Sequence, residues 1–175
     1  MNCIVLYKSK YGATKKYAEG IAEELNCTVK DTKNMVVDEL LQYDTIIYGG
    51  GLYAEIINGV ILLTKNMDKL KGKKLIVYTT GITPLDCRDY YDKLVIEKNF
   101  KPEMLEQVKV YNFMGKMIFD ELTLVHRTAI KTLKKLMKGK ENPTEMEKLL
   151  IELCDADGDF TDRASIKELV EYAKE

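Results

Sequence analysis

The sequence has no tryptophan, a single histidine and only three prolines among its 175 residues. No apolar run reaches the roughly 20 residues that a bilayer-spanning helix needs, so we expect no membrane span. The formal net charge is -1, with 27 basic and 28 acidic side chains. This balance gives no reason to expect nucleic acid as a partner.

The chain is also poor in cysteine motifs. Its four cysteines are widely spread and form no C-x-x-C pair; they are Cys3, Cys27, Cys87 and Cys154. This spacing predicts neither a disulfide framework nor a zinc site, and it favours buried, inert thiols in a reducing environment. We therefore expect a cytoplasmic protein without a metal site.

Residues 155–159 have alternating carboxylates, as an EF-hand calcium loop does. Phe160, however, occupies the position where that loop needs glycine, and Ile166 the position of its bidentate glutamate. We expect a turn before the last helix instead, capped by Thr161 or Asp162.

Two common nucleotide-binding motifs are missing as well. The sequence has no G-x-x-x-x-G-K-[ST] and no G-x-G-x-x-G, which argues against a P-loop nucleoside triphosphatase and an NAD-type pyrophosphate site. No Ser-His-Asp or paired-carboxylate spacing is present, so demanding chemistry would have to come from a cofactor. The one histidine, His126, falls in a helical apolar stripe, and we expect it to be structural rather than catalytic.

The most informative segment that is present is the loop at residues 9–14. It lies between a strand-like apolar run at 3–7 and a helical pattern at 17–25. The backbone N–H groups of a helix N-terminus lack internal partners, and the helix dipole adds positive charge there. The segment therefore predicts a phosphate site, with an ordinary capped turn as the alternative. Its candidate residues are Ser9, Lys10, Tyr11, Gly12, Ala13 and Thr14.

Two further loops are predicted at the ends of apolar strands. One begins with three consecutive glycines, which permit unusual backbone torsions and let a flat ligand approach the main chain; a flexible turn with a core tyrosine is the alternative. Because an open α/β sheet binds its ligand at the carboxyl ends of its strands, the three loops together predict one site. The added candidates are Gly49, Gly50, Gly51, Leu52, Tyr53, Thr79, Thr80 and Gly81.

Apolar periodicity predicts strands that alternate with helices along one domain, residues 1–175. Such alternation is typical of a parallel sheet covered on both faces, with strand order 2-1-3-4-5. The predicted strands are 2–8, 27–31, 45–49, 74–79 and 107–113, with a short turn at 38–41. The predicted helices are 13–25, 57–70, 89–98, 115–139, 143–153 and 161–174.

The loop at 9–14 resembles the flavodoxin loop T-x-T-G-N-T, with Ala13 in place of asparagine. The resemblance implies a flavodoxin-like three-layer α/β/α sandwich with a five-stranded parallel sheet and FMN as the cofactor. It assigns the FMN phosphate to residues 9–14 and the two edges of the isoalloxazine ring to 49–53 and 79–81. It also implies a redox-sensitive peptide at Gly50 and Gly51.

A helical insertion at about 115–153, after the fifth strand, departs from a small flavodoxin. In position and character it resembles that of the flavodoxin-type protoporphyrinogen dehydrogenases, which pass electrons to menaquinone. This resemblance implies an FMN flavoprotein that transfers electrons from a small-molecule substrate such as protoporphyrinogen. The alternatives are an electron carrier between redox partner proteins and a non-redox binding module of the same fold.

The insertion contains a basic helix at residues 126–140. Its cationic side chains are Arg127, Lys131, Lys134, Lys135, Lys138 and Lys140. We expect a solvated face over an apolar core stripe. The alternative is peripheral contact with a membrane or a quinone-linked partner.

Overall fold

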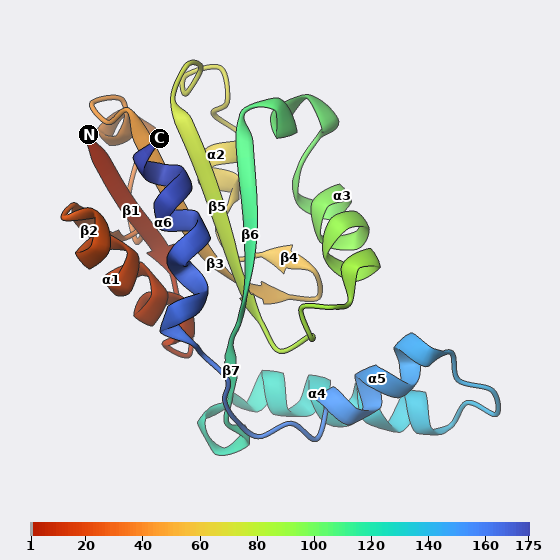
Figure 1. The fold of residues 1–175 in the computed structure, drawn as a ribbon. Helices are drawn as coiled ribbons and strands as arrows, with labels where there is room; N and C mark the ends of the chain where they lie inside the picture. Colours follow the sequence, from red (N-terminus) through yellow and green to blue (C-terminus); the bar gives the residue numbers. More distant parts are fainter. Residues whose placement is uncertain (1) are drawn as a thin grey trace.

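The computed structural model describes residues 2–175 and forms three layers (Figure 1). Its central sheet has five parallel strands in the order β2-β1-β3-β5-β6, and a short β4 pairs antiparallel with β3. The strands are β1 (Cys3–Lys8), β2 (Thr28–Asp31), β3 (Thr45–Tyr53), β4 (Ile56–Ile57), β5 (Lys74–Gly81) and β6 (Val108–Met114). The parallel order confirms the predicted flavodoxin-like sandwich.

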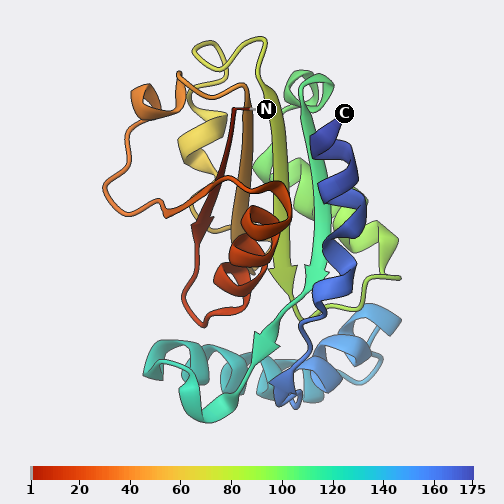
Figure 2. The same ribbon diagram turned by 60° about the vertical axis from the view of Figure 1, so that its left-hand side comes forward.

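Alternating side chains of the strands build a core on each face of the sheet. On one face, α1 (Ala13–Leu25) and α6 (Lys167–Lys174) pack over the strands (Figure 2). On the other face lie α2 (Ile61–Thr64), a π-helical turn (Tyr90–Val95) and α3 (Ile96–Asn99). Each face therefore has its own continuous apolar cluster.

The predicted helix at 57–70 is wrong in most of its length. In its place the chain forms β4, the four-residue α2 and turns. Asn99 accepts a hydrogen bond from the Ile57 backbone, and the Tyr48 hydroxyl donates to the Asn58 carbonyl at 2.7 Å. Gly59 then adopts a φ of 78°, which ends any helix there. Long-range hydrogen bonds thus replace the local helical ladder.

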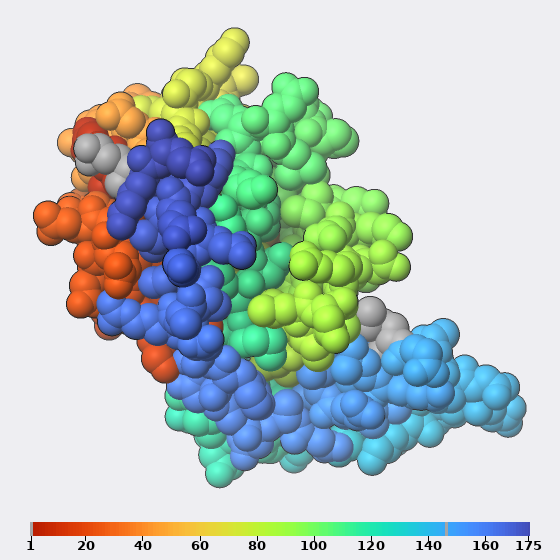
Figure 3. All heavy atoms as spheres, in the orientation of Figure 1, coloured from red at the N-terminus to blue at the C-terminus, as the bar shows by residue number. Residues whose placement is uncertain are grey.

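The insertion lies beneath the carboxyl ends of the strands and projects beyond the foot of the main body (Figures 1 and 3). The predicted helix at 115–139 is wrong in its first nine residues, which form a strand and a 3-10 turn. The elements of the insertion are β7 (Lys116–Met117), the turn Phe119–Glu121, α4 (Leu124–Lys138), α5 (Glu145–Leu153) and β8 (Gly158–Asp159). β7 and β8 pair antiparallel.

Side chains fix the starts of these helices. Thr123 caps α4, and Thr144 with Glu147 forms a capping box at α5. Asp162 accepts a hydrogen bond from the Ala164 backbone at 2.9 Å and caps the 3-10 turn Arg163–Ile166 that leads into α6, which confirms one of the two predicted caps. The predicted helix at 161–174 is α-helical only from Lys167. Within residues 2–175, no helix is long and apolar enough to cross a membrane.

Candidate functional site

A cavity of about 570 Å³ lies between the carboxyl ends of the strands and the insertion. It brings together ten of the fourteen site residues that the sequence predicts. These ten are Ser9, Lys10, Tyr11, Ala13, Thr14, Gly51, Leu52, Tyr53, Thr80 and Gly81. The other four, Gly12, Gly49, Gly50 and Thr79, are absent from its lining.

The loop at 9–14 leaves the start of α1 open to a ligand. Gly12 occupies the N-cap position with a φ of 93°, a left-handed conformation that favours glycine. No side chain caps α1, and its first turn contains no acidic residue. Ser9 Oγ accepts a hydrogen bond from the Gly12 N–H at 3.0 Å, which holds the loop closed. The N–H groups and dipole of the first turn are therefore suited to an anion.

A buried pair of hydroxyls joins this loop to β5. Thr14 Oγ1 lies 2.7 Å from Thr80 Oγ1, and both side chains are buried. Since one hydrogen serves the bond between the two oxygens, the second remains available to a ligand. The Tyr78 hydroxyl donates to the Thr14 carbonyl at 2.8 Å, and burial raises the pKa of Tyr78 well above its ordinary value. Tyr78 is thus a permanent donor beneath the start of α1.

The three glycines lie within β3 rather than in a turn, so the expectation of unusual torsions there is wrong. In residues 2–175, positive φ values among glycines occur at Gly12, Gly59 and Gly72. A Cβ on Gly49 would lie 2.0 Å from Tyr78 Cζ, and one on Gly50 would lie 2.6 Å from Ile57 Cγ2. These two glycines make room for protein side chains.

The third glycine faces the cavity. A Cβ on Gly51 would lie 3.2 Å from Tyr53 Cε2, so the Tyr53 ring passes over this position. The Tyr53 ring also packs on His126, with centroids 5.2 Å apart and planes tilted by 39°. Burial raises the pKa of Tyr53 to about 12, which keeps its hydroxyl protonated. Tyr53 is the aromatic side chain that this strand presents to a ligand.

At the end of β5, some residues point into the core and others line the cavity. Thr79 points inward and donates to Asn112 Oδ1 at 2.7 Å. Thr80 and Gly81 line the cavity. A Cβ on Gly115 would lie 3.1 Å from the Gly81 nitrogen, so the chain leaving β6 passes closely against this edge. The backbone at Gly115 thus packs against Gly81 and bounds the cavity at the start of the insertion.

Sequence reasoning missed the opposite wall of the cavity. Apolar side chains of the insertion form it: Leu122, Ala129, Ile130, Leu133, Leu150 and Leu153. The helical stripe in the sequence indicated a buried face at 130 and 133, but nothing local indicated what that face covers. His126 is also here, with Nδ1 2.6 Å from the Tyr11 hydroxyl oxygen. It contacts the ligand loops rather than an apolar core.

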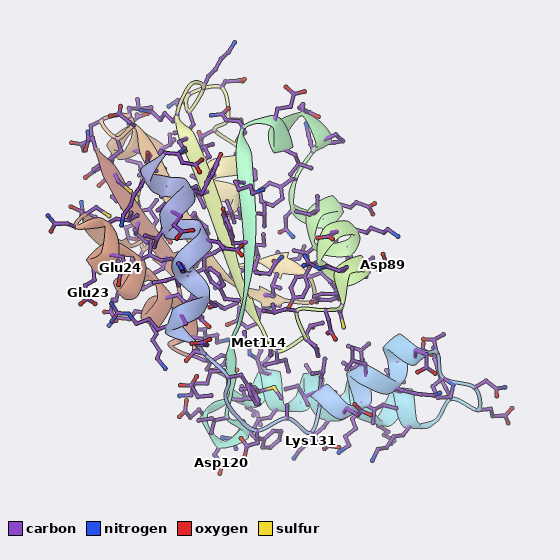
Figure 4. All side chains as sticks on the ribbon, viewed as in Figure 1. Glu23, Glu24, Asp89, Met114, Asp120 and Lys131 are labelled. Carbon is purple, nitrogen blue, oxygen red and sulfur yellow. The ribbon has the colours of Figure 1, made fainter. Side chains whose placement is uncertain are left out.

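Four of the six basic residues at 126–140 have partners within the insertion. Lys134 pairs with Asp155, and Lys140 pairs with Glu147. Arg127 donates to the Leu122 carbonyl at 2.9 Å. The Lys131 ammonium lies 5.6 Å from the centroid of the Phe119 ring (Lys131 is labelled in Figure 4). Lys135 and Lys138 are exposed as well, and the choice between a solvated face and a membrane contact stays a prediction.

Taken together, the cavity offers two kinds of surface. At the start of α1 it presents N–H groups, hydroxyls and Lys10, which suit a phosphate. Elsewhere it presents Tyr53, the edge of β5 and the apolar wall of the insertion, which suit a flat and largely apolar group. One ligand with a phosphate at one end and a ring system at the other matches this arrangement.

Comparison with known proteins agrees with the fold. A profile described as a flavodoxin domain matches residues 4–144. A solved flavodoxin, a WrbA-like protein from Agrobacterium tumefaciens, is 16% identical, with a TM-score of 0.51 over 99% of this chain and 97% of that chain. At this identity the likeness shows the fold alone. No curated protein matches the sequence significantly.

Two other solved structures are similar over a smaller share of this chain. Oxidised Flavodoxin 2 from Bacillus cereus is 21% identical, covering 65% of this chain and 84% of that chain, with a TM-score of 0.46. A flavoprotein in complex with FMN from Lactobacillus acidophilus NCFM is 16% identical, covering 65% of this chain and 91% of that chain, with a TM-score of 0.41.

Proposed function

This chain belongs to the flavodoxin domain family, and we propose that it binds FMN and transfers electrons through it. The observation that carries the proposal is the uncapped start of α1, which opens into a cavity walled by Tyr53 and the end of β5. The donor set there fits the phosphate of FMN, and the flat, apolar remainder fits its ring. Once bound, FMN would supply one-electron and two-electron chemistry.

Different residues would bind the phosphate and the ring of FMN. Residues 9–14 hold the phosphate through the backbone N–H groups of α1 and the hydroxyl of Thr14. Gly51 and Tyr53 border one edge of the ring, and Thr80 and Gly81 border the other. Gly49, Gly50 and Thr79 do not line the cavity, and their role is to pack the strands that position these groups.

We expect the purified protein to retain stoichiometric FMN after removal of excess cofactor. Absorption spectroscopy would show bands near about 370 and 450 nm that bleach on anaerobic reduction, because the flavin carries the redox chemistry. A colourless protein with no measurable FMN affinity would leave the non-redox binding module as the function.

The apolar wall of the insertion favours an enzyme over a simple electron carrier. It faces the same cavity as the ligand loops, so a largely apolar macrocyclic substrate such as protoporphyrinogen would lie between the ring and α4. Anaerobic reduction of the bound flavin by the substrate, followed at 450 nm, tests this. Reduction only by a redox partner protein would favour the carrier.

We further propose that α4 contacts an anionic membrane peripherally. Its outer side has three exposed apolar side chains, Leu124 (80% exposed), Val125 (74%) and Leu136 (62%). Lys135 and Lys138 lie on the same outer side, and the helix contains no acidic residue. This mixture is typical of a helix that lies in a lipid interface.

Replacing Lys135 and Lys138 together by glutamine should weaken binding to anionic vesicles. Each lysine near such a surface contributes about 1 kcal/mol, so the partition coefficient should fall roughly thirtyfold. Vesicle sedimentation at low and high salt measures this. A matched variant at two partnered lysines, Lys16 and Lys69, is the control, and equal effects of the two pairs would contradict the proposal.

A further inference from the structure

His126 joins the insertion to two of the ligand loops. It lies on α4, and its Nδ1 is 2.6 Å from the hydroxyl oxygen of Tyr11, which follows β1. Its ring packs on Tyr53 from the end of β3, at 5.2 Å between centroids. Its Nε2 lies 3.4 Å from the Lys10 ammonium. Elements distant in the sequence thus meet at one imidazole on the cavity wall.

These contacts fix which ring nitrogen carries the hydrogen. An ammonium group has no acceptor, so Nε2 of His126 must accept from Lys10, and the hydrogen of a neutral ring must be on Nδ1. The Nδ1–H then donates to the Tyr11 oxygen. That oxygen also accepts from the Thr123 backbone N–H at 3.3 Å. With both acceptor positions of Tyr11 used, its own O–H hydrogen is left free for a ligand.

We propose that neutral His126 is a positioning residue for the ligand site. Its imidazole holds Tyr11 so that the hydroxyl hydrogen of Tyr11 is free to donate to a ligand oxygen. The same contact keeps α4 closed against residues 9–14. The identity of that ligand as FMN rests on the proposed function. The Nδ1–H tautomer and the contact with Lys10 do not depend on the proposed function.

The arrangement should depend on pH. Protonation of His126 removes the acceptor at Nε2 and places a second positive charge beside Lys10. The other titratable groups that face the imidazole are the Tyr11 and Tyr53 hydroxyls, and the charged side chains of Glu55 and Lys116 line the same cavity. Burial, followed by the charge of Lys10, lowers the pKa of His126. The closed arrangement is therefore complete above the ordinary histidine pKa and is lost as the pH falls through the lowered pKa of His126.

A double-mutant cycle on FMN affinity at pH 7.5 tests the coupling. His126→Phe and Tyr11→Phe should each weaken FMN binding about five- to tenfold, the effect of one hydrogen bond. The double variant should be no weaker than the weaker single variant, because both remove the same contact. His126→Asn, whose amide donates near the position of Nδ1, should recover most of the affinity. Additive losses, or no loss in either single variant, would overturn the proposal.

Because the chain has one histidine, its imidazole ¹⁵N signals need no assignment, and they test the tautomer without FMN. The proposal requires the Nδ1–H form at neutral pH, a titration below the ordinary histidine pKa, and a smaller pH dependence of FMN affinity in His126→Asn than in the unaltered protein. The Nε2–H form would overturn it. Failure of the unaltered protein to bind FMN would contradict the proposed function while leaving the tautomer result to stand.

Discussion

Replacing Gly49 by alanine should be among the most damaging single-methyl changes in this protein. The added Cβ would lie 2.0 Å from Cζ and 2.2 Å from the hydroxyl oxygen of Tyr78. Tyr78 is fully buried, and Gly49 pairs with it across β3 and β5, so neither strand can move without breaking the sheet. We expect a loss of about 3 kcal/mol in the free energy of unfolding, at the upper end for overpacked cores.

Chemical denaturation of the protein without cofactor measures this loss. Gly139→Ala is the matched control, because the added Cβ there has its nearest neighbours at 3.6 Å, an ordinary contact. Gly49→Ala should also cost less in a Tyr78→Val background, which removes the atoms that clash. Equal stabilities of Gly49→Ala and Gly139→Ala would show that Tyr78 does not need this space.

The same displacement should reach the ligand site. Tyr78 donates to the Thr14 carbonyl from beneath the start of α1, so moving its ring removes support from the phosphate loop. Any folded Gly49→Ala protein should therefore bind FMN more weakly than Gly139→Ala. This effect on FMN binding would be indirect, since Gly49 does not line the cavity.

The sequence predicted the fold where local pattern determines it. The strand at β1 and the helix at 13–25 were predicted within a residue because their apolar period is carried by neighbours in sequence. The helix at 57–70 was wrong although Ile57 and Leu63 do reach the core. Turns can bury the same side chains, and the hydrogen bond from Ile57 to the distant Asn99 favours them. No pattern in the local sequence predicts that contact.

The site shows the same division between local and distant information. The loop at 9–14 was recognisable because a strand, a hydroxyl-rich turn and a helix follow one another directly. The triple glycine was located correctly at the ligand end of β3, but its reason lies in Tyr78 and Ile57. The contact of His126 with Tyr11 joins residues 115 positions apart, and no local pattern in the sequence indicates it.

Thr14→Val should have the largest effect on FMN binding. Valine keeps the shape of threonine in a buried site but removes Oγ1, which bonds to Thr80 at 2.7 Å. The variant loses a donor to the phosphate and leaves Thr80, also buried, without its partner. A hydrogen bond to a charged group is worth about 1.5–3 kcal/mol, so we expect FMN affinity to fall about a hundredfold.

Riboflavin separates this loss from general damage to the cavity, because it lacks the phosphate. Titrations followed by flavin fluorescence should show that Thr14→Val greatly weakens FMN binding but changes riboflavin affinity far less. Thr132→Val, at an exposed position on α4, should change neither. Equal losses for both flavins would mean that Thr14 acts through the packing of α1 on β5. Unchanged FMN affinity would move the phosphate away from residues 9–14, because no rearrangement of that loop could replace a buried donor at no cost.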